Sequence, residues 1–107
     1  MDCSDRIYHQ NSFGQARKCT CHGAVHITFG TVSLLLSKTQ LSGFATWIAE
    51  ALMSECDVED RDERCIYLPT RDYCLMFAMT YNELISLSEI LDQTALMIQI
   101  EDSLSMN

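Results

Sequence analysis

Two short helix-start motifs divide the chain, and each follows a segment with the pattern of a β-strand. Ser37–Gln40 and Thr80–Glu83 both have the Ser/Thr-x-x-Gln/Glu spacing of a capping box. In this motif the hydroxyl and the later side chain satisfy backbone N–H groups at the start of a helix. The two motifs begin 43 residues apart. They predict helices that start at equivalent points of a repeated strand–strand–helix unit.

Apolar residues recur at helical spacing after each motif. The first stripe predicts a helix that ends near Ser54, and the second predicts a helix beyond Thr80. The segment Leu96–Ile100 also alternates like a strand, so it is compatible with either structure. The two stripes are Leu41, Phe44, Ile48, Ala51 and Leu52, and then Leu84, Leu87, Leu91, Ala95 and Ile98.

Short segments that alternate or are rich in β-branched and aromatic residues predict strands before each helix. Together these elements predict an α+β fold, with an antiparallel sheet of four to five strands and two helices on one face. The order ββα-ββα is compatible with duplication of one unit. The predicted strands are Arg17–Cys21, Val25–Phe29, Thr31–Leu36, Cys65–Leu68 and Tyr73–Met79.

The domain organisation follows from these segments. Residues 1–15 lack periodicity, and we expect a flexible or loosely docked N-terminal arm. Residues 16–107 form a single α+β domain, with a first half at 16–54 and a second half at 65–107. Residues 55–64 hold six acids and two arginines, which predicts an exposed acidic loop between the halves.

The charge balance restricts the class of partner. Fifteen acids against seven bases give a net charge of −8, which repels nucleic acids and anionic membrane surfaces. The chain has neither an apolar run of membrane-spanning length nor the start of a signal peptide. We therefore expect a cytoplasmic protein whose six cysteines are reduced.

The candidate site residues Cys19, Cys21, His22 and His26 lie within eight positions. If His22 and Gly23 form a two-residue turn, Cys19 lies opposite His26. Alternation then puts Cys19, Cys21 and His26 on the face away from the core, with His22 at the turn. Thiolate and imidazole are the ligands that zinc prefers, so this hairpin is a candidate zinc site.

A tetrahedral site needs a fourth ligand, and its candidates are Cys3, His9, His22 and Cys56. However, a Cys-x-Cys pair on an extended strand separates its sulfurs by roughly 6.5–7 Å. This is too far for both to bind one ion unless the strand bends. Small reduced cysteines on a strand are therefore the competing interpretation.

Three segments of the chain resemble a family of short uncharacterised bacterial proteins. They are the run from Cys19 through Phe29-Gly30 to Ser37, the Tyr67-Leu68-Pro69 turn and the Leu75–Leu84 junction. This domain of unknown function is known mainly from Bacteroidetes, and the resemblance covers about residues 19–98. The chain departs from the family at Thr31, where asparagine is expected, and in having one residue instead of two between Cys19 and Cys21. The resemblance implies no known activity.

The sequence contains no assembled active-site pattern. We therefore expect a small non-catalytic protein-interaction or self-associating module, with a protein partner or a homodimer formed through the open sheet face. One alternative is a zinc-binding protein that uses the Cys/His hairpin. A second is a thiol-dependent enzyme in which Cys19 is the nucleophile and His26 the base.

Overall fold

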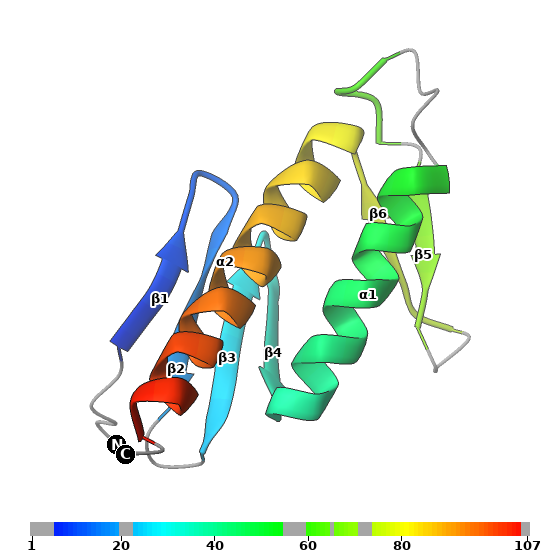
Figure 1. The fold of residues 1–107 in the computed structure, drawn as a ribbon. Coiled ribbons are helices and arrows are strands. Elements are labelled where there is room, and N and C mark those ends of the chain that lie inside the picture. Colours follow the sequence, from blue (N-terminus) through cyan, green and yellow to red (C-terminus); the bar gives the residue numbers. More distant parts are fainter. Residues whose placement is uncertain (1–5, 20–22, 55–59, 65, 71–73, 106–107) are drawn as a thin grey trace.

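The computed structural model describes residues 6–19, 23–54, 60–64, 66–70 and 74–105. Four strands precede the first helix, and a two-stranded hairpin precedes the second (Figure 1). The elements are β1 (Arg6–Gln10), β2 (Gly14–Cys19), β3 (Ala24–Phe29), β4 (Val32–Leu36), α1 (Lys38–Ser54), β5 (Ile66–Pro69), β6 (Met76–Met79) and α2 (Tyr81–Ser105).

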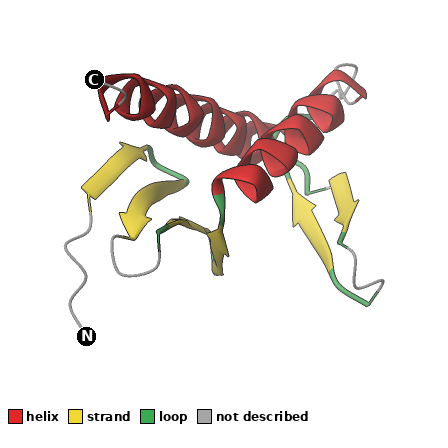
Figure 2. Cartoon of the chain, turned by 60° about the horizontal axis from the view of Figure 1, so that its bottom comes forward, coloured by secondary structure: helices red, strands yellow, loops and turns green. Residues whose placement is uncertain are grey.

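The strands form two antiparallel sheets. The first has the order β1-β2-β3-β4, and the second is the β5–β6 hairpin. Figure 2 shows both helices on one side of the strands, which confirms the expected α+β class and helix placement. The expected units are present as β3–β4–α1 and β5–β6–α2, but β1 and β2 precede them, so the order differs from ββα-ββα.

Residues 6–15, which we expected in a flexible arm, form β1, a turn and the start of β2. Asn11 builds the turn, because its Oδ1 accepts hydrogen bonds from the N–H groups of Phe13 and Gly14 at 3.0 and 3.1 Å. Gly14 is required there, since a Cβ atom would collide with the carbonyl oxygen of Thr28. This turn is therefore specified by its own residues.

Contacts with α2 hold β1 in place. The ladder with β2 shifts between Ile7 and His9, and this irregularity leaves Tyr8 buried. The Tyr8 hydroxyl donates to Glu101 at 3.2 Å, and His9 Nε2 lies 2.8 Å from Glu89 Oε2. These partners are distant in the sequence, so no local pattern predicts this strand.

The capping boxes are confirmed at both helix starts. The backbone N–H of Gln40 donates to Ser37 Oγ at 3.1 Å, and the N–H of Ser37 donates to Gln40 Oε1 at 2.9 Å. Thr80 and Glu83 form the same reciprocal pair at 2.9 and 3.0 Å. The first helix ends at Ser54, as predicted.

Helix α2 runs without interruption to Ser105, so the segment Leu96–Ile100 is helical. Its buried stripe includes Ile90, which widens the predicted stripe, and Thr94 takes the place of Ala95, because Thr94 is fully buried whereas Ala95 is exposed. Neither described helix combines the length and the apolar composition that crossing a bilayer requires.

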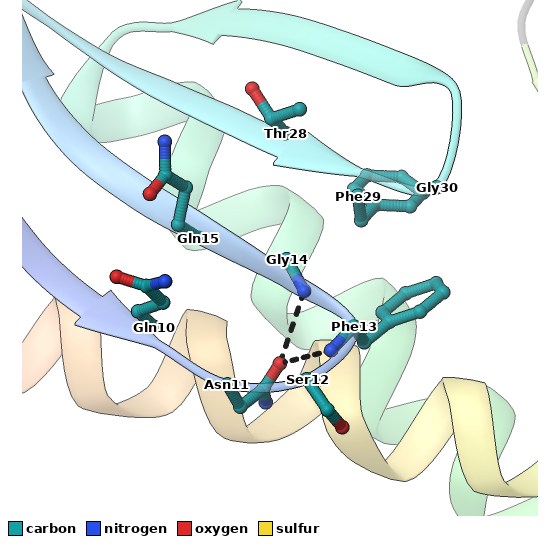
Figure 3. Close-up of a pocket in the computed structure, with 9 residues that line it drawn as sticks. All are labelled: Gln10, Asn11, Ser12, Phe13, Gly14, Gln15, Thr28, Phe29 and Gly30. Atoms are coloured by element: carbon teal, nitrogen blue, oxygen red, sulfur yellow. Dashed lines mark hydrogen bonds between the residues drawn. The ribbon is translucent and has the colours of Figure 1, made fainter.

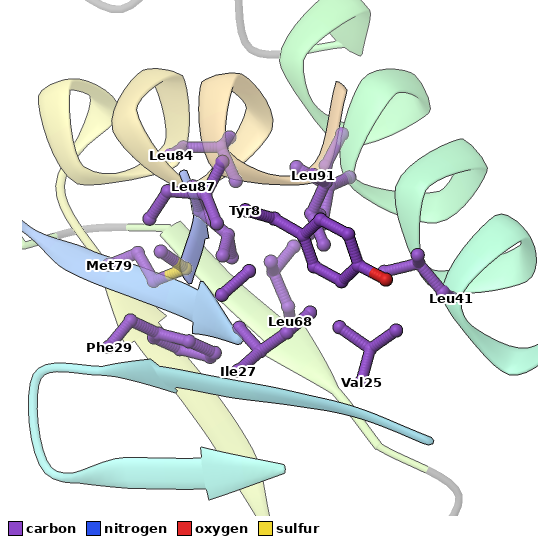
Figure 4. Close-up of a cluster of buried hydrophobic side chains, with 14 of the residues drawn as sticks. Tyr8, Val25, Ile27, Phe29, Leu41, Leu68, Met79, Leu84, Leu87 and Leu91 are labelled. Atoms are coloured by element: carbon purple, nitrogen blue, oxygen red, sulfur yellow. The ribbon is translucent and has the colours of Figure 1, made fainter. Parts of the chain in front are cut away.

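The core lies between the strands and the two helices. Figure 4 shows Tyr8 and Val25 directed from the strands toward the same layer as Leu41 and Leu91 of the helices. Burial of this apolar surface is the main driving force for folding. The buried cluster consists of Tyr8, Ala16, Val25, Ile27, Phe29, Leu41, Ile48, Ala51, Ile66, Leu68, Met79, Leu84, Leu87, Ile90, Leu91 and Ile98.

Candidate functional site

The structure brings Cys19 and His26 to the same face of the sheet, but not opposite one another. Cys19 pairs with Ala24 and Arg17 pairs with His26. The predicted register was wrong, because four residues and not two connect the paired positions Cys19 and Ala24. Cys21 and His22, in this connection, lie outside the described residues.

His26 joins three strands on the face away from the helices. Its Nδ1 lies 2.9 Å from Nη2 of Arg17 on β2, and its Nε2 is hydrogen-bonded to Oγ of Ser33 on β4. A guanidinium only donates, so Nδ1 accepts and the proton of the neutral ring lies on Nε2. This tautomer donates to Ser33 and does not act as its base. In this tautomer the one free lone pair of the ring, on Nδ1, is directed at Arg17.

The geometry narrows the choice of metal ligands. His9 binds Glu89 on the helix-covered face, opposite the face of His26, so it is not the fourth ligand. Within the described ranges, no three His, Cys, Asp or Glu side chains gather to hold a metal ion. The other candidates, Cys3 and Cys56, lie outside those ranges. The zinc site stays a prediction, as does the Cys19 nucleophile.

The open face of the sheet is mainly polar. Its side chains include Gln15, Arg17, His26 and Thr28, and Leu35 is 52% exposed among them. A stable homodimer interface is usually more apolar than this at its centre. This polar composition does not support pairing of the open face across a dimer.

A different feature stands out between the two sheets. Two adjoining hollows of about 770 and 670 Å³ share Leu34, Thr70 and Phe77 in their walls. We call them together the β4–β6 groove. Figure 1 places β6, and not β5, on the side toward β4. The apolar residues that line the groove are Phe13, Phe29, Val32, Leu34, Leu36, Phe44, Trp47, Pro69, Leu75, Met76, Phe77, Ala78 and Met79.

Phe77 forms the centre of an aromatic cluster along this groove. Its ring centroid lies 5.7 Å from that of Phe29 on β3, and 6.5 and 6.2 Å from those of Phe44 and Trp47 on α1. Such tilted and edge-to-face pairs are favourable beyond the area they bury. Aromatic rings from both sheets and a helix thus supply an apolar wall to the groove.

One side of the groove is the unpaired edge of β4. Strands β3 and β4 are joined by a two-residue turn in which Gly30 has φ of +54°, as the first position of a type II′ turn requires. The residues that flank such a turn form a hydrogen-bonded pair, and these pairs then alternate. Val32 and Leu34 therefore bond to β3, whereas Ser33 and Leu35 direct their N–H and C=O groups away from β3, along the open edge of β4. Of these two residues, Ser33 lines the groove.

The opposite side is the unpaired edge of β6. The N–H of Thr70 donates to the carbonyl of Leu75 at 3.1 Å, so by the same alternation Met76 and Ala78 direct their backbone groups away from β5. The Ala78 carbonyl accepts a hydrogen bond from Arg64 Nη1 at 2.9 Å. Arg64 thus covers one group of this edge and leaves the groups of Met76 exposed toward β4.

An ion pair closes one end of the groove. Arg64 Nη1 and Nη2 lie 2.6 and 3.1 Å from the two carboxylate oxygens of Glu83. Burial alone would raise the pKa of Glu83, but the hydrogen bonds from Arg64 and from the Thr80 backbone hold it below its ordinary value. The acidic segment that precedes Arg64 contacts the start of α2, since Asn82 donates to Asp62 at 2.7 Å.

A smaller hollow of about 230 Å³ lies at the β1–β2 turn (Figure 3). Figure 3 shows Asn11 Oδ1 bonded to the backbone of Phe13 and Gly14. The Asn11 amide donates to the Ser86 carbonyl at 2.9 Å. These polar groups stabilise the turn, so the hollow is a consequence of the local fold.

The β4–β6 groove was not predicted from the sequence. A local signal was present, because Val32–Leu36 is apolar apart from one serine and contains no charge. The relative placement of the two sheets is a tertiary property that this signal does not contain. Comparisons with protein-family models, with curated proteins and with solved structures found no match to this chain.

Proposed function

We propose that this chain is a non-catalytic protein-interaction module that binds an extended segment of a partner protein in the β4–β6 groove. The observation that carries the proposal is the presence of two unpaired strand edges that face one another across an apolar groove. An added strand gains main-chain hydrogen bonds from the edge and side-chain contacts from the pockets beside it.

The contrast between the four strand edges supports this assignment. Natural edges are protected by bulges, charged residues or proline. The outer edge of the first sheet carries Arg6 and the irregularity at Tyr8, and β5 carries Pro69. The β4 edge has none of these devices. We infer that the β4 edge is unprotected in the free protein because a partner strand covers it in the complex.

The side-chain lining supports an alternating ligand. Leu34 and Phe77 are half-buried, whereas the residues on either side of each are exposed, so both lie on the helix-facing sides of their strands. A strand that continues the sheet from β4 directs every second side chain toward these residues and toward Trp47. Apolar residues at alternate positions of the partner segment therefore suit this groove.

The proposal includes a cytoplasmic setting and a protein as the partner, not a nucleic acid. The cysteine content and the net charge of −8 support both. Each described lysine or arginine already contacts a side chain of its own chain: Arg6, Arg17, Lys18, Lys38, Arg61 and Arg64.

Trp47 provides the test, because it is the only tryptophan and lines the groove. A panel of capped peptides, in which an apolar residue alternates with threonine, is titrated against the protein. We expect a saturable change in Trp47 fluorescence with members of this panel. If no peptide of the panel produced a saturable change in Trp47 fluorescence, the proposal would be contradicted.

A matched pair of variants assigns the binding to the β4 edge. Leu35→Pro removes an N–H of the unpaired β4 edge beside the groove, whereas Leu35→Ala retains it. Loss of one such hydrogen bond weakens binding by about tenfold. We expect this loss in Leu35→Pro alone, with unchanged circular dichroism because the Leu35 amide is outside the β3–β4 ladder. Equal binding by the two variants would contradict docking at β4.

A further inference from the structure

We infer that the partner segment is basic, with lysine or arginine flanking its alternating apolar residues. This inference rests on the proposed docking of an extended segment in the β4–β6 groove, and it specifies the chemistry of the occupant. Its basis is the charge distribution at the end of the groove where Arg64 and Glu83 meet.

The arginines at this end are already engaged. Arg64 makes its two-point contact with Glu83, and the Arg61 guanidinium lies 5.1 Å from the ring centroid of Tyr81. These contacts leave little positive charge to attract an acidic ligand. Arg64 also covers the Ala78 carbonyl, which marks where pairing with β6 ends.

The neighbouring acids are available. Asp60, Asp62 and Glu63 are exposed, and none of them forms an ion pair within the part of the chain that the structure describes. The Asp62 side chain accepts a hydrogen bond from Asn82 at the start of α2, so its carboxylate is held beside this end of the groove. A cation on the bound segment gains favourable interactions with these carboxylates.

The same charges disfavour a second copy of the chain as the occupant. Each copy carries a net charge of −8, so self-association brings like charges together and is opposed most strongly at low ionic strength. Among the described residues that line the groove, the only formal charges are those of the paired Arg64 and Glu83, which do not offset this repulsion. The negative electrostatic potential that repels a second copy of the chain attracts a basic segment of a different protein.

Three capped peptides test the inference. They share the same alternating valine–threonine core and differ only in their flanking residues, which are lysine, serine or glutamate. Trp47 fluorescence and sedimentation are measured at low and high salt. We expect the lysine peptide to bind about tenfold more tightly than the glutamate peptide at low salt, and the difference to shrink at high salt. We also expect the protein without peptide to sediment as a monomer.

Two double variants with equal net charge locate the effect. Asp62→Asn with Glu63→Gln removes charge next to Arg64 and Glu83, which line the end of the groove. Glu50→Gln with Asp92→Asn removes the same charge from exposed positions within α1 and α2. We expect the first pair to weaken lysine-peptide binding about threefold at low salt and the second to leave it unchanged.

The outcomes separate the two proposals. Equal affinity for the three peptides would overturn the basic segment and leave the docking groove in place. A dimer that Leu35→Pro dissociates, and that excludes every peptide, would identify a second copy as the occupant and overturn the inference. No Trp47 response to any alternating peptide would overturn the groove itself.

Discussion

The rings of Phe77 on β6 and Phe29 on β3 meet edge to face, with centroids 5.7 Å apart and an interplanar angle of 81°. This contact joins the β5–β6 hairpin to the four-stranded sheet, although no ladder connects them. The hairpin is therefore positioned by side-chain packing. Main-chain groups on both facing edges remain available to a ligand.

Phe77→Ala tests this packing. We expect a loss of about 2 kcal/mol in the free energy of unfolding, less than for a fully buried phenylalanine because Phe77 is half-buried. Urea denaturation measures the change. Met76→Ala, on the outer face of the same strand, is the control and should change stability by less than about 0.5 kcal/mol. Equal losses in the two variants would show that Phe77 does not anchor the hairpin.

The capping box at α1 makes a separate prediction. Ser37→Ala removes the acceptor for the Gln40 amide and should destabilise the protein by about 1 kcal/mol. Ser42→Ala, at an exposed interior position of α1, should be neutral or slightly stabilising. Thermal unfolding of both variants measures the difference. A neutral Ser37→Ala variant would contradict a stabilising role for this cap.

The Tyr8 hydroxyl predicts a loss of stability at high pH. Burial and the nearby Glu101 carboxylate raise the pKa of Tyr8 from 10.0 to about 12. Between these values the unfolded chain ionises before the folded protein, so stability is complete below pH 10 and falls as pH rises toward 12. The difference in phenolate absorbance between the wild type and Tyr8→Phe should titrate near the upper value. Titration near 10 would contradict the buried contact with Glu101.

The lowered pKa of Glu83 predicts that the free energy of unfolding decreases as the pH becomes more acidic. Its pKa is lowered, so its contribution to stability is present above the ordinary value of 4.5 and is lost as pH falls through the folded pKa. Glu83→Gln retains a capping acceptor but removes the charge. We expect lower stability at neutral pH and a shallower decline toward acid pH, measured by urea denaturation. Glu50→Gln is the exposed control, and parallel curves for the wild type and Glu83→Gln would contradict the ion-pair account.

Local patterns predicted the parts of the fold that depend on neighbouring residues. The caps at Ser37 and Thr80 were visible because each motif makes its hydrogen bonds within four residues. Strand β1 was missed, because the contacts of Tyr8 and His9 with α2 join segments far apart in the sequence. Its position depends on tertiary contacts more than on an apolar pattern.

The candidate site was predicted less well than the fold. The shared face of Cys19 and His26 follows from alternation, but their register depends on the length of the connection between β2 and β3. The partners of His26, Arg17 and Ser33, lie on two different strands, so no spacing in the sequence indicated them. The groove requires the placement of β6 beside β4, which no single segment determines.

Amide hydrogen exchange, followed residue by residue with and without the lysine-flanked peptide, tests strand addition at β4 at the level of single N–H groups. We expect bound peptide to slow exchange at Ser33 and Leu35, whose N–H groups lie on the unpaired edge of β4. Leu34 and Leu36, whose N–H groups bond to β3, should be unchanged. Saturable peptide binding with no protection at Ser33 and Leu35 would contradict strand addition at β4.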